Sequence, residues 1–293
     1  MKLDRKGIGS FIAITFGLTW LIEFALISTG FRMTAMPPIM GQLVIAAVMW
    51  VPALATILTV KFVTGEGFAI TNLRFGSWKP YLVTALLIPS AFVLIYGLTW
   101  LLGFGVPDWA LVNFKNTLSQ AGADLATFPS ASQVLPGIFL ATLLVSPFIN
   151  SIFAFGEEFG WRGYLLPKLM PMGKTKAYLV LGIIWGLWHA PLILVGFNYP
   201  GYPILGIVMM MLFTTTMGII INEYTLAYRS SILAGWMHGV INSQGYGVWR
   251  ILFADSNPVL GGIAGLVGAV VWLVLGIVMM RRFRVRREKH ESI

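Results

Sequence analysis

Long apolar runs organise this chain, and Gly, Pro or charged residues interrupt them. A spanning helix needs about 20 mostly apolar residues, and eight runs come close to this size. We therefore predict eight membrane spans, at residues 8–30, 39–62, 80–104, 137–166, 177–197, 204–222, 231–250 and 259–280. The only long connection between them covers residues 105–136 and is polar near its centre.

The composition makes lipid the main solvent of the chain. Hydrophobic residues make up 57 % of the 293 positions and charged residues 11 %, and the mean hydropathy is +0.82. In a soluble domain, charged residues make up roughly a quarter of all positions. We expect an all-α, polytopic integral membrane bundle of about eight transmembrane helices. Because the chain has no cysteine, disulfides, thiol catalysis and a cysteine zinc site are excluded.

The net charge of +9 is concentrated at one end of the chain. Six of the twenty Lys and Arg residues follow the last apolar run: Arg281, Arg282, Arg284, Arg286, Arg287 and Lys289. A basic cluster directly after a membrane helix attracts anionic lipid. We therefore expect anionic lipids, and not nucleic acid, as the partner of this tail.

The distribution of basic residues also predicts the orientation. With the N-terminus inside, seventeen Lys and Arg residues fall on inner segments and three, Arg32, Lys115 and Arg250, fall outside. Since positive residues favour the cytoplasmic side, both termini should be cytoplasmic and residues 105–136 should lie outside. The run at residues 8–30 is too long for a signal-peptide core, so we expect it to be retained as the first helix.

Polar side chains inside the predicted spans are the candidate functional residues, because a charge within a membrane is costly and usually faces an interior cavity. They come from four spans: Glu23 from the first, Glu157, Glu158 and Arg162 from the fourth, His189 from the fifth, and His238 and Asn242 from the seventh.

In the fourth span, two adjacent carboxylates point in different directions. Arg162 follows Glu158 by one helical turn, a spacing suited to an ion pair. Glu157 is rotated by about 100° from Glu158, so it remains available as a base. The alternative is an ordinary snorkelling ion pair at a helix end.

The helical rise per residue places the candidate residues of three spans at a common depth in the membrane. His189 lies one turn after Trp185, and Asn242 one turn after His238. At about 1.5 Å per residue, these side chains and Glu157 fall in a layer roughly 10–18 Å below the cytoplasmic surface. The spacing therefore allows one site built from three spans.

Three motifs carry a resemblance to a known family. Glu157-Glu158-x-x-x-Arg162, an aromatic residue-x-x-x-His189 and His238-x-x-x-Asn242 together resemble the CPBP intramembrane proteases, the CAAX-processing and bacteriocin-processing enzymes related to type II CAAX prenyl endopeptidases. Trp185 stands where this family usually has Phe, which affects only local packing. We expect N-terminal spans and an outer loop at residues 1–136, the catalytic core at 137–250, and a last span with the basic tail at 251–293.

The resemblance implies an intramembrane endopeptidase. Glu157 and His189 would activate a water molecule, His238 and Asn242 would stabilise the oxyanion, and Glu158 with Arg162 would hold the geometry. Glu157, His189 and His238 could instead hold a divalent metal such as zinc. Because there is no His-Glu-x-x-His helix, metal-dependent and metal-free mechanisms both remain open.

The resemblance implies a peptide or protein substrate at the membrane, and the sequence leaves open whether it is a prenylated CAAX protein or a leader peptide. We expect the plasma membrane of a prokaryotic cell as the location. Two other functions remain as alternatives: a transporter or proton relay, since Glu and His also line ion paths, and a catalytically silent scaffold or bacteriocin-immunity protein. Glu23 has no motif around it.

Overall fold

The computed structural model describes residues 3–33, 39–126 and 128–291. All regular structure in this part of the chain is helical. The helices are α1 (Arg5–Ser28), α2 (Ile39–Val48), α3 (Val51–Leu58), α4 (Lys79–Leu101), α5 (Val112–Gln120), α6 (Ala131–Leu140), α7 (Ser146–Glu158), α8 (Leu166–Leu169), α9 (Lys174–Trp188), α10 (Ala190–Leu194), α11 (Pro203–Tyr228), α12 (Ser231–Tyr246), α13 (Val248–Leu252) and α14 (Leu266–Glu291). Turns of π-helix join α6 to α7 at Ala141–Val145 and α7 to α8 at Phe159–Leu165.

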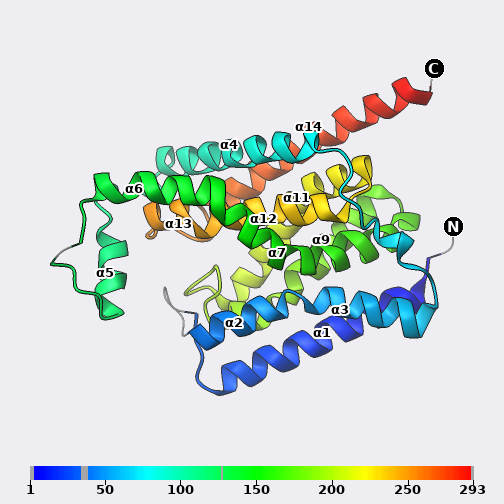
Figure 1. Ribbon diagram of the computed structural model, residues 1–293, viewed down its shortest axis with the longest axis horizontal. Helices are drawn as coiled ribbons and strands as arrows, with labels where there is room; N and C mark the ends of the chain where they lie inside the picture. The colour runs from blue at the N-terminus through cyan, green and yellow to red at the C-terminus, as the bar shows by residue number, and fades with distance from the viewer. Residues whose placement is uncertain (1–2, 34–38, 127, 292–293) are drawn as a thin grey trace.

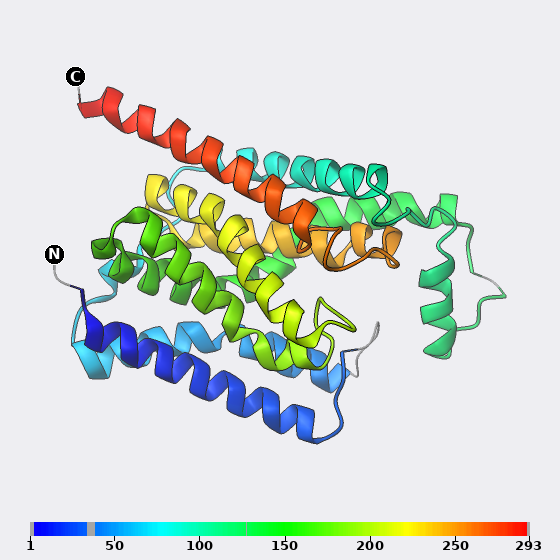
Figure 2. The same cartoon turned by 180° about the vertical axis from the view of Figure 1, so that it is seen from behind.

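The helices form a bundle with an enclosed centre (Figure 1). Helix α1 and the α2–α3 pair run along one side, α4 and α14 along the opposite side, and α7, α9, α11 and α12 lie between them; the reverse view agrees (Figure 2). Six helical segments of the described residues are long and apolar enough to cross a membrane. The predicted polytopic helical membrane fold is therefore confirmed.

The two central helices are shorter than predicted. The run at residues 177–197 forms α9 of 15 residues, which ends at Trp188, and a separate short α10. Helix α12 has 16 residues. Pro191 lies in the first turn of α10, where its missing N–H is least costly. Both central helices pack mainly against protein, so they do not need the length that a lipid-exposed span requires.

The ends of two other predicted spans also differ. The fourth span is a continuous helical segment over Ala131–Met172, longer than the predicted 137–166. The eighth begins at Leu266 and not at residue 259, because Gly261, Gly262 and Gly265 lie in turns before it. Glycine disfavours helix because it loses the most backbone freedom on folding.

Glycine pairs spaced by four residues bring the central helices into close contact. A Cβ at Gly235 or Gly239 of α12 would lie 3.0 Å or less from backbone atoms of α7, and one at Gly182 or Gly186 of α9 would lie 2.4 Å from backbone atoms of α11. Small residues at this spacing let membrane helices approach closely. The α7–α12 pair has the most extensive contact in the bundle.

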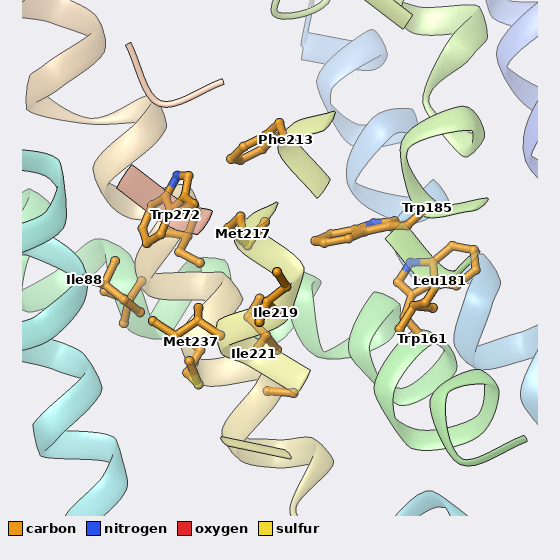
Figure 3. Packing of buried hydrophobic residues seen from close by; sticks show 14 of the residues in the cluster. Ile88, Trp161, Leu181, Trp185, Phe213, Met217, Ile219, Ile221, Met237 and Trp272 are labelled. Carbon is orange, nitrogen blue, oxygen red and sulfur yellow. The ribbon is translucent and has the colours of Figure 1, made fainter. Parts of the chain in front are cut away.

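Large side chains fill the space on both sides of α11. In Figure 3, Met217 of α11 lies between Trp272 of α14 on one side and Trp185 of α9 on the other, with Trp161 beside Trp185. All four are buried. Because protein interiors are close-packed, this core fixes the rotation of α9 and of the fourth span, and with it the direction of their polar side chains.

An ionic cluster anchors the start of α1. Asp4 accepts a hydrogen bond from the Gly7 amide at 2.9 Å, which caps the helix. Lys168 lies 2.7 Å from Asp4 and 2.6 Å from Glu66. The bond from the Lys168 ammonium holds the pKa of the Asp4 carboxyl below its usual value. This cluster ties the N-terminal helix to the end of the fourth span.

Lipid contact by the basic tail and an outer location of residues 105–136 stay predictions. Helix α14 extends to Glu291, but the side chains of Arg286, Arg287 and Lys289 lie outside the described residues, so lipid contact by the tail remains a prediction. The connection between α4 and α6 contains α5, which lies at the opposite end of the molecule from the start of α1 and the end of α14 (Figure 1).

Candidate functional site

The fourth span places its two carboxylates at the end of an α-helix. Glu157 and Glu158 are the last residues of α7, and the π-helical segment Phe159–Leu165 follows directly. Both side chains are buried, at 3 % and 0 % exposure. The sequence predicted regular α-helix here. The wider π turn is common at functional sites, and it still leaves Arg162 within reach of Glu158.

The predicted ion pair between Glu158 and Arg162 is present. Arg162 Nη1 lies 2.8 Å from Glu158 Oε1, and Arg162 Nε donates a second hydrogen bond to Asn222 Oδ1 at 3.0 Å. The arginine is fully buried. A buried carboxylate and guanidinium stabilise one another only when further hydrogen bonds satisfy them. Asn222 of α11, which the sequence did not single out, supplies one of these bonds.

His238 of α12 joins this pair from across the bundle. Its Nδ1 lies 2.9 Å from Glu158 Oε1, the same oxygen that accepts the bond from Arg162. A carboxylate oxygen only accepts, so Nδ1 carries the proton and Nε2 is the nitrogen left for chemistry. Glu158 thereby links α7 to α12 as well as to Arg162. Sequence reasoning had paired Glu158 with Arg162 alone.

Glu157 has a different partner, the indole of Trp185. Trp185 Nε1 donates a hydrogen bond to Glu157 Oε2 at 2.8 Å. The same indole lies 4.2 Å from the Arg162 guanidinium carbon and meets the His238 ring edge-on, with centroids 5.3 Å apart. The expectation that Trp at this position alters only packing is wrong, because a Phe side chain has no N–H to donate.

His189 lies where α9 ends. Its Nδ1 is 2.8 Å from the Trp185 carbonyl oxygen, which can only accept, so Nδ1 holds the proton and Nε2 has a free lone pair. The His189 ring is half-buried and lies 6.2 Å from the Trp185 ring, centroid to centroid. The break between α9 and α10 thus exposes a neutral imidazole nitrogen next to the buried cluster.

Trp185 therefore contacts four of the predicted site residues, Glu157, Arg162, His189 and His238. Asn242 follows His238 by one turn of α12 and is half-buried; within the described part of the chain, no hydrogen bond of its side chain connects it to the other site residues. Among these residues, no three His, Asp or Glu side chains gather as metal ligands. The metal set Glu157, His189 and His238 remains a prediction.

A bundle of apolar helices around a buried Glu, Arg and His cluster defines a polytopic membrane protein with an interior polar site. Residues 133–244, which hold the cluster, match the family described as Type II CAAX prenyl endopeptidase Rce1-like. A protein named CAAX prenyl protease 2 from Methanococcus maripaludis is 32 % identical over 185 residues, 51 % of this chain and 66 % of that protein. Through this segment the chain is similar to the CPBP, or type II CAAX protease, family. The match spans just under two thirds of the relative's length.

Proposed function

We propose that this protein is an intramembrane endopeptidase of the CAAX type, which hydrolyses a peptide bond with a water molecule activated by Glu157 and His189. The observation that carries this proposal is the contrast between the two adjacent carboxylates. Glu158 is bound by Arg162 and His238, whereas Glu157 accepts an indole hydrogen bond from Trp185 and forms no ion pair among the described residues. A buried carboxylate without a counter-ion is a strong base for a water proton.

The two histidines have complementary parts in this mechanism. The free Nε2 of His189 accepts a hydrogen bond from the attacking water and orients it. His238, whose Nδ1 is held by Glu158, offers Nε2 to the carbonyl oxygen as it becomes an oxyanion; the Glu158 carboxylate stabilises the imidazolium that makes Nε2 a donor. Asn242 adds a second donor, which in other enzymes contributes about 3 kcal/mol.

The surroundings of the site favour an apolar substrate. A groove of about 440 Å³ lies between the α3 segment and the fourth span and is lined by apolar side chains, among them Trp50, Phe155 and Phe159. Phe155 and Phe159 lie two residues before and after Glu157, so the groove lies on the face of the fourth span turned away from Glu157. A C-a-a-X sequence directs prenylation of its cysteine, and an isoprenoid chain suits such a groove. We propose prenylated CAAX peptides as the substrate class in preference to leader peptides.

The test is peptidase activity of the purified protein with a farnesylated C-a-a-X peptide, its unprenylated form and a leader peptide. We expect cleavage of the farnesylated peptide and none by Glu157→Gln, which keeps the shape of the side chain and removes the base. Full activity of a correctly folded Glu157→Gln protein would refute the mechanism. Preference for the leader peptide would refute the substrate class.

The same assay with a chelator addresses the metal. A metal-free mechanism predicts an unchanged rate after chelation, whereas an essential zinc predicts loss of activity that added zinc restores. Measuring the metal content of the wild type and of Glu157→Gln further separates the metal-dependent mechanism from the metal-free one. A variant of a metal ligand loses its metal together with its activity.

A further inference from the structure

Helix α1 contributes a buried carboxyl that the matched family segment does not contain. Only every fourth residue of α1 is buried, in a stripe that ends at Glu23. Glu23 is 2 % exposed, although its neighbours Leu21 and Phe24 are 69 % and 48 % exposed. A carboxyl group enters a membrane helix at considerable cost and normally faces an interior site.

The turn that carries Glu23 is docked against the end of α9. Trp188 Nε1 donates a hydrogen bond to Thr19 Oγ1 at 2.9 Å, and Trp20 Nε1 donates one to the Trp188 carbonyl at 3.1 Å. Trp188 directly precedes His189, and their rings lie 4.8 Å apart, centroid to centroid. Glu23 follows Thr19 by one turn on the same buried stripe, so it faces the region of His189. Its carboxyl also lies close enough to that of Glu157 for the two to interact electrostatically.

Nothing in the described part of the chain neutralises Glu23. Its Oε2 is buried without a hydrogen-bond partner, and it takes part in no ion pair there. The buried cation of the site, Arg162, is bound to Glu158 and Asn222. An unpaired buried carboxylate beside a second one is costly, so Glu23 holds a proton when Glu157 is ionised. Paired carboxyl groups that share one charge divide acid and base roles in other hydrolases.

We propose that Glu23 is the general acid of the site, which protonates the departing amine while Glu157 acts as the base. This inference rests on the proposed peptidase function. Glu157 takes one proton from water, and the hydroxide oxygen bonds to the peptide carbonyl carbon. The C–N bond then breaks, its electron pair stays on nitrogen, and that nitrogen takes the Glu23 proton. Transfer of the proton held by Glu157 to Glu23 restores both groups.

A change of leaving group can distinguish an acid role of Glu23 from a role in packing. An amide nitrogen needs a proton to leave, whereas a nitrophenolate leaves without one. Glu23→Gln keeps the shape but cannot give up a proton. We expect Glu23→Gln to lower kcat for the farnesylated C-a-a-X peptide by roughly 100-fold, with little change in KM. It should hydrolyse a nitrophenyl ester of the same prenylcysteine at close to the wild-type rate.

Two further variants complete the experiment. Glu23→Asp keeps an acid at this position and should recover part of the amide activity. Thr19→Val, on the same stripe one turn away, removes the contact with Trp188 and should affect amide and ester equally. Equal losses on both substrates in Glu23→Gln, or unimpaired amide cleavage by it, would overturn the acid role. If the wild type itself cleaves neither substrate, the proposed function fails and this inference fails with it.

Discussion

Trp185 is the residue on which the geometry of the site depends most. Its indole N–H holds Glu157, its ring covers Arg162 and meets His238, and its carbonyl fixes the tautomer of His189. Indole and guanidinium faces attract one another, by about 2 kcal/mol or more when desolvated. One side chain therefore aligns Glu157, the structural ion pair and both histidines.

Trp185→Phe is expected to reduce kcat by roughly tenfold with little change in KM. It keeps an aromatic ring against Arg162 but removes a hydrogen bond to a charged group, which contributes about 1.5 kcal/mol. Steady-state kinetics measure the change. Trp236→Phe is the matched control, since the Trp236 indole donates to the Tyr81 carbonyl, away from the site; equal rates in the two variants would contradict the role of Trp185.

Arg162→Ala is expected to destabilise the fold by about 3 kcal/mol, because it leaves Glu158 as a buried charge without its main counter-ion. Thermal unfolding in detergent would register the loss as a lower Tm. The double variant Arg162→Ala with Glu158→Gln removes the uncompensated charge and should regain part of that stability. If the single variant unfolds at the wild-type temperature, the pair has no structural role.

At the scale of elements, the α7–α12 contact brings the two halves of the site together. Glu158 ends α7 and His238 lies in α12, so the 2.9 Å bond between them depends on how closely these helices approach. A Cβ at Gly239 would come within 2.6 Å of Ser151 backbone atoms. The close approach is possible only with glycine there.

Gly239→Ala is therefore expected to lower both stability and activity. Forcing a methyl group into this contact costs about 1–3 kcal/mol and displaces His238, the preceding residue, from Glu158. Unfolding temperature and peptidase rate are the two measurements. Gly97→Ala in α4 is the control, because no atom lies within 4 Å of its added Cβ; the contact is unimportant if both variants behave alike.

At the scale of the whole molecule, the orientation decides from which side substrate arrives. The start of α1 and the end of α14 lie at one end of the bundle, and α5 lies at the other (Figures 1 and 2). The charge asymmetry of seventeen basic residues to three predicts that the end with the termini is cytoplasmic. A substrate made in the cytoplasm would then first meet the end of the bundle that carries the termini.

Introduced cysteines can test this orientation, because the chain has none of its own. Ser119 in α5 and Lys176 near the start of α9 are both exposed. We expect Ser119→Cys to react with a membrane-impermeant thiol reagent in intact cells, and Lys176→Cys to react only after lysis. The reverse pattern would invert the predicted topology.

Some of this architecture follows from the sequence alone. Apolar runs longer than about 20 residues dictate membrane helices, and the spacing of Glu158 and Arg162 dictates their ion pair, because contacts within one helix are set by local geometry. The glycine pairs at 182 and 186 and at 235 and 239 were also readable, since their four-residue spacing is a signal of close helix packing. The start of α14 was misplaced because apolar residues surround the glycines that break the helix there.

The tertiary structure alone decided which side chains meet across helices. The bonds from His238 to Glu158 and from Trp185 to Glu157, and the position of Glu23 beside that site, join residues 28 or more positions apart. Sequence spacing gives the face of each helix but not its rotation or depth against another. Those are set by how large side chains and glycines pack over the whole bundle, so the partners of Glu157 became visible only in the folded chain.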